Sequence, residues 1–142
     1  MIIADTGFWV ALFNVNDHDH KQCRTFLAGR REPLISTTPV LTETTHLLIQ
    51  RRHTQIACRF LELFAAQRKN GLIQLFETCV EHLDRQCVLM RQYQSLPMDF
   101  ADASLVILAE HLGHGRIVST DRRDFDTYRW KNRHPFRNLL LE

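Results

Sequence analysis

The chain has 142 residues, of which 44% are hydrophobic, which is the usual size of one globular domain with a buried core. Its formal net charge is only +2, so a polyanion would have to be bound by local basic clusters rather than by the whole molecule. No apolar run is long enough for a membrane span, and the first run meets Asp5 too early for a signal peptide. We therefore expect one soluble, cytoplasmic domain over residues 1–142, with no membrane segment.

Strand-like and helical patterns alternate through the first half of the chain. MIIA predicts a first strand, and DTGFWVALF predicts a short helix directly after it. DHDHKQCRTFLAGRR predicts a second helix with Asp17 as its N-cap. PLIST predicts the next strand, and TPVLTETTHLLIQRR a helix with Thr38 at the N-cap and Pro39 at the first helical position.

The same alternation continues to the carboxyl terminus. TQIACRFLELFAAQRKNG predicts a helix, LIQLFE a strand, and CVEHLDRQCVLMRQYQ a further helix. PMDFADASLVILAEHLG predicts a central helix with Asp99 near its N-cap and Gly113 as its stop. RIVST predicts the last inner strand, and FRNLLLE an edge strand or an apolar brace. Such alternation is typical of an α/β layered fold, in which helices cover a parallel sheet.

The cysteines and histidines do not form a metal-binding pattern. The four cysteines contain no CxxC pair and fall in helix-like stretches among apolar neighbours, which predicts reduced core cysteines rather than a zinc site. The acids and histidines of DHDH, Asp17 to His20, diverge at i and i+2 spacing on a helix, so we expect no shared ligand face there. Phe8 and Trp9 are interpreted as core or dimer-interface residues, and His46 as a residue that could approach Glu43.

Four acids stand where burial is expected. Asp5 and Asp121 each follow an apolar strand, and ligands of open parallel sheets gather at the carboxyl ends of the strands. Asp102 and Glu43 share helical faces with apolar residues that are expected to face inward. Buried charges are costly unless they are paired or bound to a metal, so this set calls for a physical reason.

Any one of these acids also has a structural interpretation. Asp99 could be only a helix cap, Asp124 could cap a terminal helix, and Glu43 could pair with an arginine of a neighbouring helix. As a set, converging carboxylates repel one another unless a cation neutralises them, and Mg²⁺ or Mn²⁺ selects oxygen ligands. Several carboxylates around such a metal suit phosphodiester hydrolysis.

These motifs together resemble the PIN-domain nucleases, and among them the VapC-like toxins of bacterial type II toxin-antitoxin pairs. IIADTGFWVALF is similar to the family's opening strand, with Asp5 as its first acid and Thr6 as the adjacent hydroxyl. PVLTETTHLL supplies the helical glutamate as Glu43, FADASLVILAEHLG the third acid as Asp102, and IVSTDRRDF the fourth as Asp121. Many relatives place a further acid two residues after the fourth one, where this chain has an arginine.

The resemblance implies a three-layer PIN-like fold whose central, mostly parallel sheet is flanked by helices. It implies Mg²⁺- or Mn²⁺-dependent endonucleolytic cleavage of structured RNA, of the tRNA or rRNA class, that leaves a 5′-phosphate and a 3′-hydroxyl. Asp5, Glu43 and Asp102 would hold the principal metal, and Asp121 would complete the site. A homodimer and a small antitoxin protein are the implied partners. Supporting residues are then Thr6, Thr120, Asp99 and Asp124, and arginines for RNA phosphates are Arg122, Arg123, Arg51 and Arg52.

Other functions stay open at this point. A phosphotransferase of the haloacid dehalogenase type would need a second Asp at position 7, which is Gly7, and a receiver domain would need a lysine near a late strand. A housekeeping RNA-processing nuclease, or a module of this fold that binds RNA or a partner without catalysis, are the main alternatives.

Overall fold

The fold is built on a five-stranded parallel sheet. The computed structural model describes all residues, 1–142. The strands stand in the order β3-β2-β1-β4-β7, and each neighbouring pair is parallel. They are β1 (Ile2–Ala4), β2 (Leu34–Thr37), β3 (Ile73–Phe76), β4 (Arg116–Val118) and β7 (Arg137–Asn138). A separate antiparallel pair is formed by β5 (Arg129–Trp130) and β6 (His134–Pro135).

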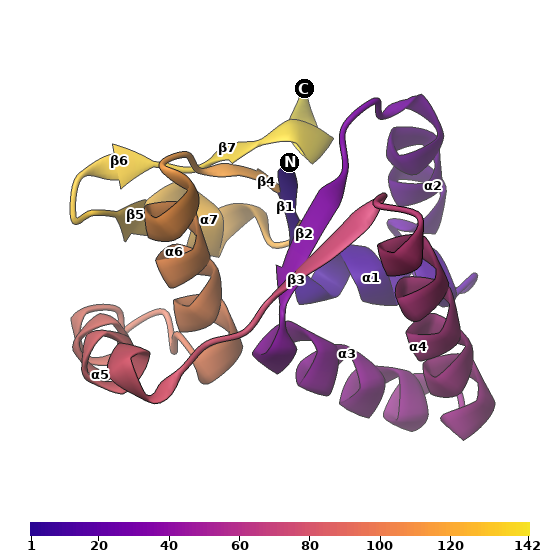
Figure 1. Ribbon diagram of the computed structural model, residues 1–142, viewed down its shortest axis with the longest axis horizontal. Helices are drawn as coiled ribbons and strands as arrows, with labels where there is room; N and C mark the ends of the chain where they lie inside the picture. The colour runs from indigo at the N-terminus through magenta and orange to yellow at the C-terminus, as the bar shows by residue number, and fades with distance from the viewer.

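Helices cover the sheet on two sides (Figure 1). They are α1 (Thr6–Phe13), α2 (His20–Gly29), α3 (Thr38–Arg51), α4 (Thr54–Lys69), α5 (Leu83–Gln92), α6 (Phe100–Leu112) and α7 (Arg122–Thr127), with 3-10 turns at Val80–His82 and Leu139–Leu141. In the figure α1, α2 and α4 lie on one side of the sheet, α5, α6 and α7 on the other, and α3 leaves the carboxyl end of β2. The predicted three-layer α/β fold is confirmed. None of these helices has the length and apolar character needed to cross a membrane.

The buried core explains the apolar runs of the sequence. Every residue of β1 and β2 is buried, and α6 is buried without interruption from Ala103 to Ala109, as expected of a central helix. Phe8 and Trp9 are core residues, and the Trp9 ring lies 5.7 Å from those of both Phe60 and Phe64. Aromatic edge contacts therefore join α1 to α4 on one side of the sheet.

Two predicted helix caps are wrong by a few residues. Asp17 is not the N-cap of α2, which begins at His20, because the preceding residues form turns in which Asp17 Oδ1 accepts from the Asp19 backbone N–H at 2.9 Å. Thr38 is not the N-cap of α3. The strand β2 ends at Thr37 and α3 begins directly at Thr38, so Thr37 is the cap, and its hydroxyl accepts from the Val40 N–H at 3.4 Å.

Other local predictions divide between confirmed and wrong. Asp99 caps α6, and Gly113 ends it in the left-handed conformation at φ +76°, which glycine adopts at little cost. The tail does add an edge strand, β7. Only Cys23 is a core cysteine. Cys58 on α4 and Cys87 on α5 face solvent, and Cys79, in the segment before the Val80–His82 turn, is exposed as well.

Candidate active site

The predicted acids meet in one cavity at the carboxyl edge of the sheet. The cavity has a volume of about 300 Å³. Asp5 reaches it from the end of β1, Asp121 from the segment after β4, Glu43 from α3, and Asp99 and Asp102 from the start of α6. Its remaining lining residues are Thr6, Gly7, Val10, Asp17, Asp19, Leu47, Arg51 and Thr120.

Asp5 is the most deeply buried of these acids and is held by two donors. Its Oδ1 accepts from the Thr6 backbone N–H at 2.6 Å, and its Oδ2 accepts from the Ser119 hydroxyl at 2.7 Å. Burial raises the pKa of Asp5 to about 6, although both hydrogen bonds act in the opposite direction, and the charge of Asp121 adds to the increase. The carboxylate is thus fixed in position and short of positive charge.

Glu43 and Asp102 are half-buried and electrostatically linked to their neighbours. Burial is the main cause that raises the pKa of each carboxyl, and nearby carboxylates raise it further: Asp99 and Asp5 act on both. Asp102 Oδ2 accepts from the Tyr128 hydroxyl and from the Asp99 N–H, at 3.3 Å each. Both acids line the cavity, Asp99 from its exposed rim and Asp102 from a half-buried position.

The segment after β4 carries two acids, Asp121 and Asp124, and the sequence did not show which of them caps the following helix. Asp121 faces the cavity and caps α7, because its Oδ1 accepts from the Asp124 N–H at 3.0 Å. Asp124 is buried outside the cavity lining and pairs with Arg123 at 3.2 Å. Its carboxyl nevertheless acts on Asp121, whose pKa is raised mainly by burial and further by Asp124. Asp121 rather than Asp124 is the helix cap.

Gly7 and Thr120 close the cavity by an unusually close approach. A Cβ at Gly7 would stand 2.1 Å from Thr120 Oγ1. The glycine therefore lets the start of α1 lie against the segment that carries Asp121. Thr6 is buried nearby, and its side chain acts on Glu43, whose pKa it lowers against the larger effect of burial.

The sequence reasoning missed two acids of this cavity, and of the four arginines that it named for RNA phosphates one lies in the cavity lining. Asp17 and Asp19 line it because the DHDH segment forms turns before α2, so the helical spacing argument does not apply. His20 is structural, with its Nδ1 2.7 Å from the Ala11 carbonyl. Arg51 lines the cavity, two turns after Glu43 on the same face of α3, whereas Arg52, Arg122 and Arg123 do not.

Ser119 is a further residue that the sequence analysis did not single out. It is fully buried, it donates to Asp5, and its oxygen accepts from the Asp121 N–H at 3.0 Å. It thereby links the ends of β1 and β4. The signal was available in the sequence, because Ser119 stands two residues before a strand-end acid, but Thr120 was chosen instead.

The donor set fits a hard divalent cation. No lysine or arginine forms an ion pair with any of the five acids from β1, β4, α3 and α6. All candidate ligands are oxygens, which Mg²⁺ and Mn²⁺ prefer. No three His, Cys, Asp or Glu side chains stand close enough together to form a ready-made metal cage. Asp5, Glu43, Asp102 and Asp121 are the groups that could hold such an ion.

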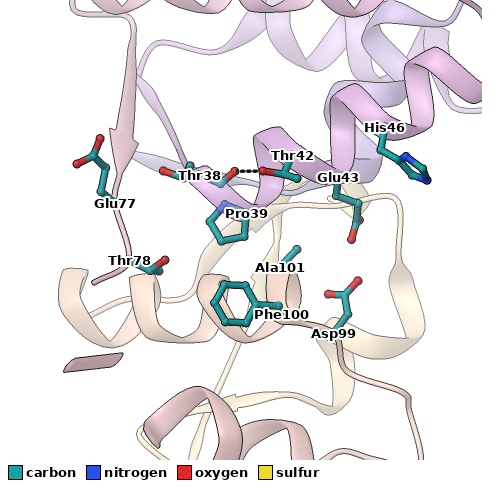
Figure 2. Close-up of a pocket in the computed structure, with 10 residues that line it drawn as sticks. All are labelled: Thr38, Pro39, Thr42, Glu43, His46, Glu77, Thr78, Asp99, Phe100 and Ala101. Carbon is teal, nitrogen blue, oxygen red and sulfur yellow. Dashed lines mark hydrogen bonds between the residues drawn. The ribbon is translucent and has the colours of Figure 1, made fainter. Parts of the chain in front are cut away.

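A larger groove opens beside this cavity between α3 and the start of α6 (Figure 2). Its volume is about 830 Å³, and it shares Glu43 and Asp99 with the acidic cavity. Figure 2 shows the carboxyl groups of these two residues turned toward each other where the groove meets the cavity. The rest of the groove is lined by Thr38, Pro39, Thr42, His46, Glu77, Thr78, Phe100 and Ala101.

Comparison with family models identifies the class of protein to which this fold and these converging acids belong. Residues 2–131 match the PIN domain, so the chain belongs to the PIN-domain family. The chain is similar to ribonuclease VapC26 of Mycobacterium tuberculosis strain ATCC 25618 / H37Rv, at 23% identity over 90% of this chain and 92% of that protein. Its fold is similar to the crystal structure of M. tuberculosis VapC20, described as a sarcin-ricin loop cleaving toxin. That likeness has a TM-score of 0.76 and 21% identity, over 87% of this chain and 92% of the other. The predicted VapC-like PIN resemblance is confirmed.

Proposed function

We propose that this chain is a metal-dependent endoribonuclease and acts as the toxin of a toxin-antitoxin pair. The observation that carries the proposal is the meeting of Asp5, Glu43, Asp102 and Asp121 in one cavity without a basic partner. Four separate segments contribute these acids. Their mutual repulsion destabilises the folded state when no cation is bound. A divalent cation bound by these acids would neutralise their charge, and this cation could then bind a phosphate group of the substrate.

In this proposal the protein supplies position and charge. Asp5, Glu43 and Asp102 hold Mg²⁺ or Mn²⁺, and Asp121 completes the site or orients the attacking water. The ion, when bound, acidifies a water molecule and stabilises charge on the phosphodiester oxygens. Ser119 fixes the Asp5 carboxylate through its 2.7 Å hydrogen bond.

Neighbouring polar groups would then bind the substrate. The hydroxyls of Thr6 and Thr120 lie at the cavity, where each can donate to a phosphate oxygen. Arg51 is the arginine placed to contact an RNA phosphate, because it lines the same cavity. Arg52, Arg122 and Arg123 lie outside that lining and would act only on more distant phosphates.

The substrate and partners follow from the relatives. VapC26 is called a ribonuclease and VapC20 a toxin that cleaves the sarcin-ricin loop, which supports RNA of the tRNA or rRNA class as the substrate of this chain. The same names support a small antitoxin as its partner. A homodimer and a place in the cytoplasm complete the proposal. An RNA-processing role without an antitoxin, or binding without catalysis, are the alternatives to be tested.

The test is cleavage of total RNA by the purified chain with Mn²⁺, with Mg²⁺ and with chelator. The Asp5→Asn and Asp102→Asn double variant is the inactive comparison, and Glu32→Gln is the matched control, because Glu32 lies at the opposite edge of the sheet. We expect discrete fragments with 5′-phosphate ends from the wild type and from Glu32→Gln, and none from the double variant. Equal behaviour of the wild type and the double variant would overturn the nuclease and favour a binding module.

A further inference from the structure

We propose that the groove between α3 and the start of α6 is a nucleobase subsite, in which the Phe100 ring stacks on one unpaired base of the RNA beside the cleaved bond. The inference rests on the proposed ribonuclease function and adds to it the part of the substrate that is recognised. The groove meets the acidic cavity at Glu43 and Asp99, which line both. A nucleotide whose phosphate lies at the acids therefore has its base within reach of the groove.

Phe100 is exposed in a way that no other aromatic residue of the chain is. The chain has nine phenylalanines, and Phe100, at 42% exposure, is the only aromatic among the exposed large apolar side chains. It is the first residue of α6, next to the cap Asp99. Figure 2 shows its ring at the floor of the groove, opposite Pro39 on α3. A flat apolar ring facing a proline is a surface on which a base can stack.

The charges of the groove select the base rather than the phosphate. No lysine or arginine lines it, whereas Glu43, Glu77 and Asp99 do. Carboxylates repel phosphate groups but accept hydrogen bonds from the exocyclic amino groups of bases. The phosphate backbone is better placed on the other side, where Arg51 lines the acidic cavity. The base of a nucleotide would thus lie in the groove and its phosphate at the acidic cavity.

Hydroxyl groups provide polar contacts along the rest of the groove. Thr38, Thr42 and His46 repeat every four residues on one face of α3, and Thr78 faces them from the segment after β3. The Thr42 hydroxyl donates to the Thr38 carbonyl at 3.2 Å and keeps its acceptor lone pairs for a ligand. Because bases inside a duplex are stacked on each other, only an unpaired or extruded nucleotide can use this surface.

Binding without cleavage is the test, measured in chelator by fluorescence anisotropy of a labelled single-stranded RNA and of its duplex. We expect Phe100→Ala to weaken binding of the single strand by about 5- to 100-fold and to leave duplex binding unchanged. Phe100→Trp should bind as tightly as the wild type or more tightly. Phe100→Leu, which keeps apolar bulk without a ring, should behave like Phe100→Ala. Val88→Ala is the control, because Val88 is exposed on α5 outside the groove.

The outcomes separate this subsite from the nuclease itself. If the wild type does not cleave RNA in Mn²⁺, the proposed function is overturned, and the subsite with it. Cleavage by the wild type together with unchanged single-strand binding by Phe100→Ala would overturn the subsite alone. So would a groove that binds a lysine-rich peptide through Phe100 but no RNA. Thermal unfolding of each variant checks that a loss of binding is not a loss of fold.

Discussion

Carboxylates at the two edges of the sheet have opposite electrostatic environments. At the amino edge Glu32 precedes β2, and it binds the Arg116 guanidinium at the start of β4 and the amino terminus at the start of β1. The Arg116 hydrogen bonds, followed by that of the amino terminus, lower the pKa of Glu32 to about 2. At the carboxyl edge burial raises the pKa of Asp5 to about 6, and no base pairs with it.

The difference lies in how the carboxylate charges are neutralised at the two edges. Glu32 is neutralised by the chain's own cations, so its edge is electrostatically complete. The acids of the carboxyl edge oppose one another, and in the proposed function a cation from outside neutralises them. Substitutions at the two edges should therefore have opposite consequences for activity and stability.

The largest effect is expected from Asp102→Asn. Loss of one charge from the ligand set should lower the rate of RNA cleavage at least about 10²- to 10³-fold, as removal of a group that stabilises transition-state charge does. The fold should persist, because Asn keeps an oxygen that accepts from the Tyr128 hydroxyl. Single-turnover cleavage in Mn²⁺ measures the rate, and a variant within tenfold of wild type would remove Asp102 from the centre.

Ser119→Ala should come next, with cleavage about 10- to 100-fold slower, as for other residues that orient metal ligands. Its hydroxyl lowers the pKa of Asp5, so its removal should raise that pKa further and shift the acidic limb of the pH–rate profile to higher pH. Ser119→Thr keeps the hydroxyl and should restore both. An unchanged pH profile in Ser119→Ala would mean that the residue serves only packing.

Gly7→Ala tests the close approach between the start of α1 and the segment after β4 at the site. The new Cβ would meet Thr120 Oγ1 at 2.1 Å, and such overpacking should reduce the free energy of unfolding by about 1 to 3 kcal/mol. The double variant Gly7→Ala, Thr120→Ala removes the oxygen and should recover most of that stability in urea unfolding. If Thr120→Ala gives no recovery, the requirement for glycine at position 7 has another cause.

The smallest effect on activity belongs to Glu32→Gln, whose cleavage rate should stay within about twofold of wild type. Its effect is on stability. The folded pKa of about 2 lies below the ordinary value of 4.5, so the contribution of Glu32 is fully present above pH 4.5 and disappears as pH falls toward 2. Urea unfolding of both forms across the acid range should therefore converge at low pH. A difference that persists there would show that charge is not its cause.

The acids of the carboxyl edge could be predicted from the sequence where a single strand or helix determines a residue's position. Asp5 and Asp121 could be placed because each follows an apolar strand of a parallel sheet. Asp102 could be placed because it begins a helix that is apolar on almost every side.

What could not be predicted depends on how loops run and how elements meet. Asp17 and Asp19 reach the cavity from turns, and turns have no regular sequence periodicity from which side-chain direction can be predicted. Ser119 matters only because β1 and β4 are neighbours, and Phe100 only because α3 passes opposite it. The amino-edge ion pairs likewise join residues far apart in sequence.

The most direct test of the unsatisfied carboxyl edge is stability against pH for the wild type and Asp5→Asn, with and without Mn²⁺. Because the folded pKa of Asp5 is about 6 and its ordinary value 3.8, the folded state binds more protons between these values. Metal-free wild type should therefore lose stability relative to Asp5→Asn as pH rises through this window, by about 1 to 3 kcal/mol. Mn²⁺ at neutral pH should restore the wild type and not the variant. Parallel pH curves, with no effect of Mn²⁺ on either protein, would contradict the account.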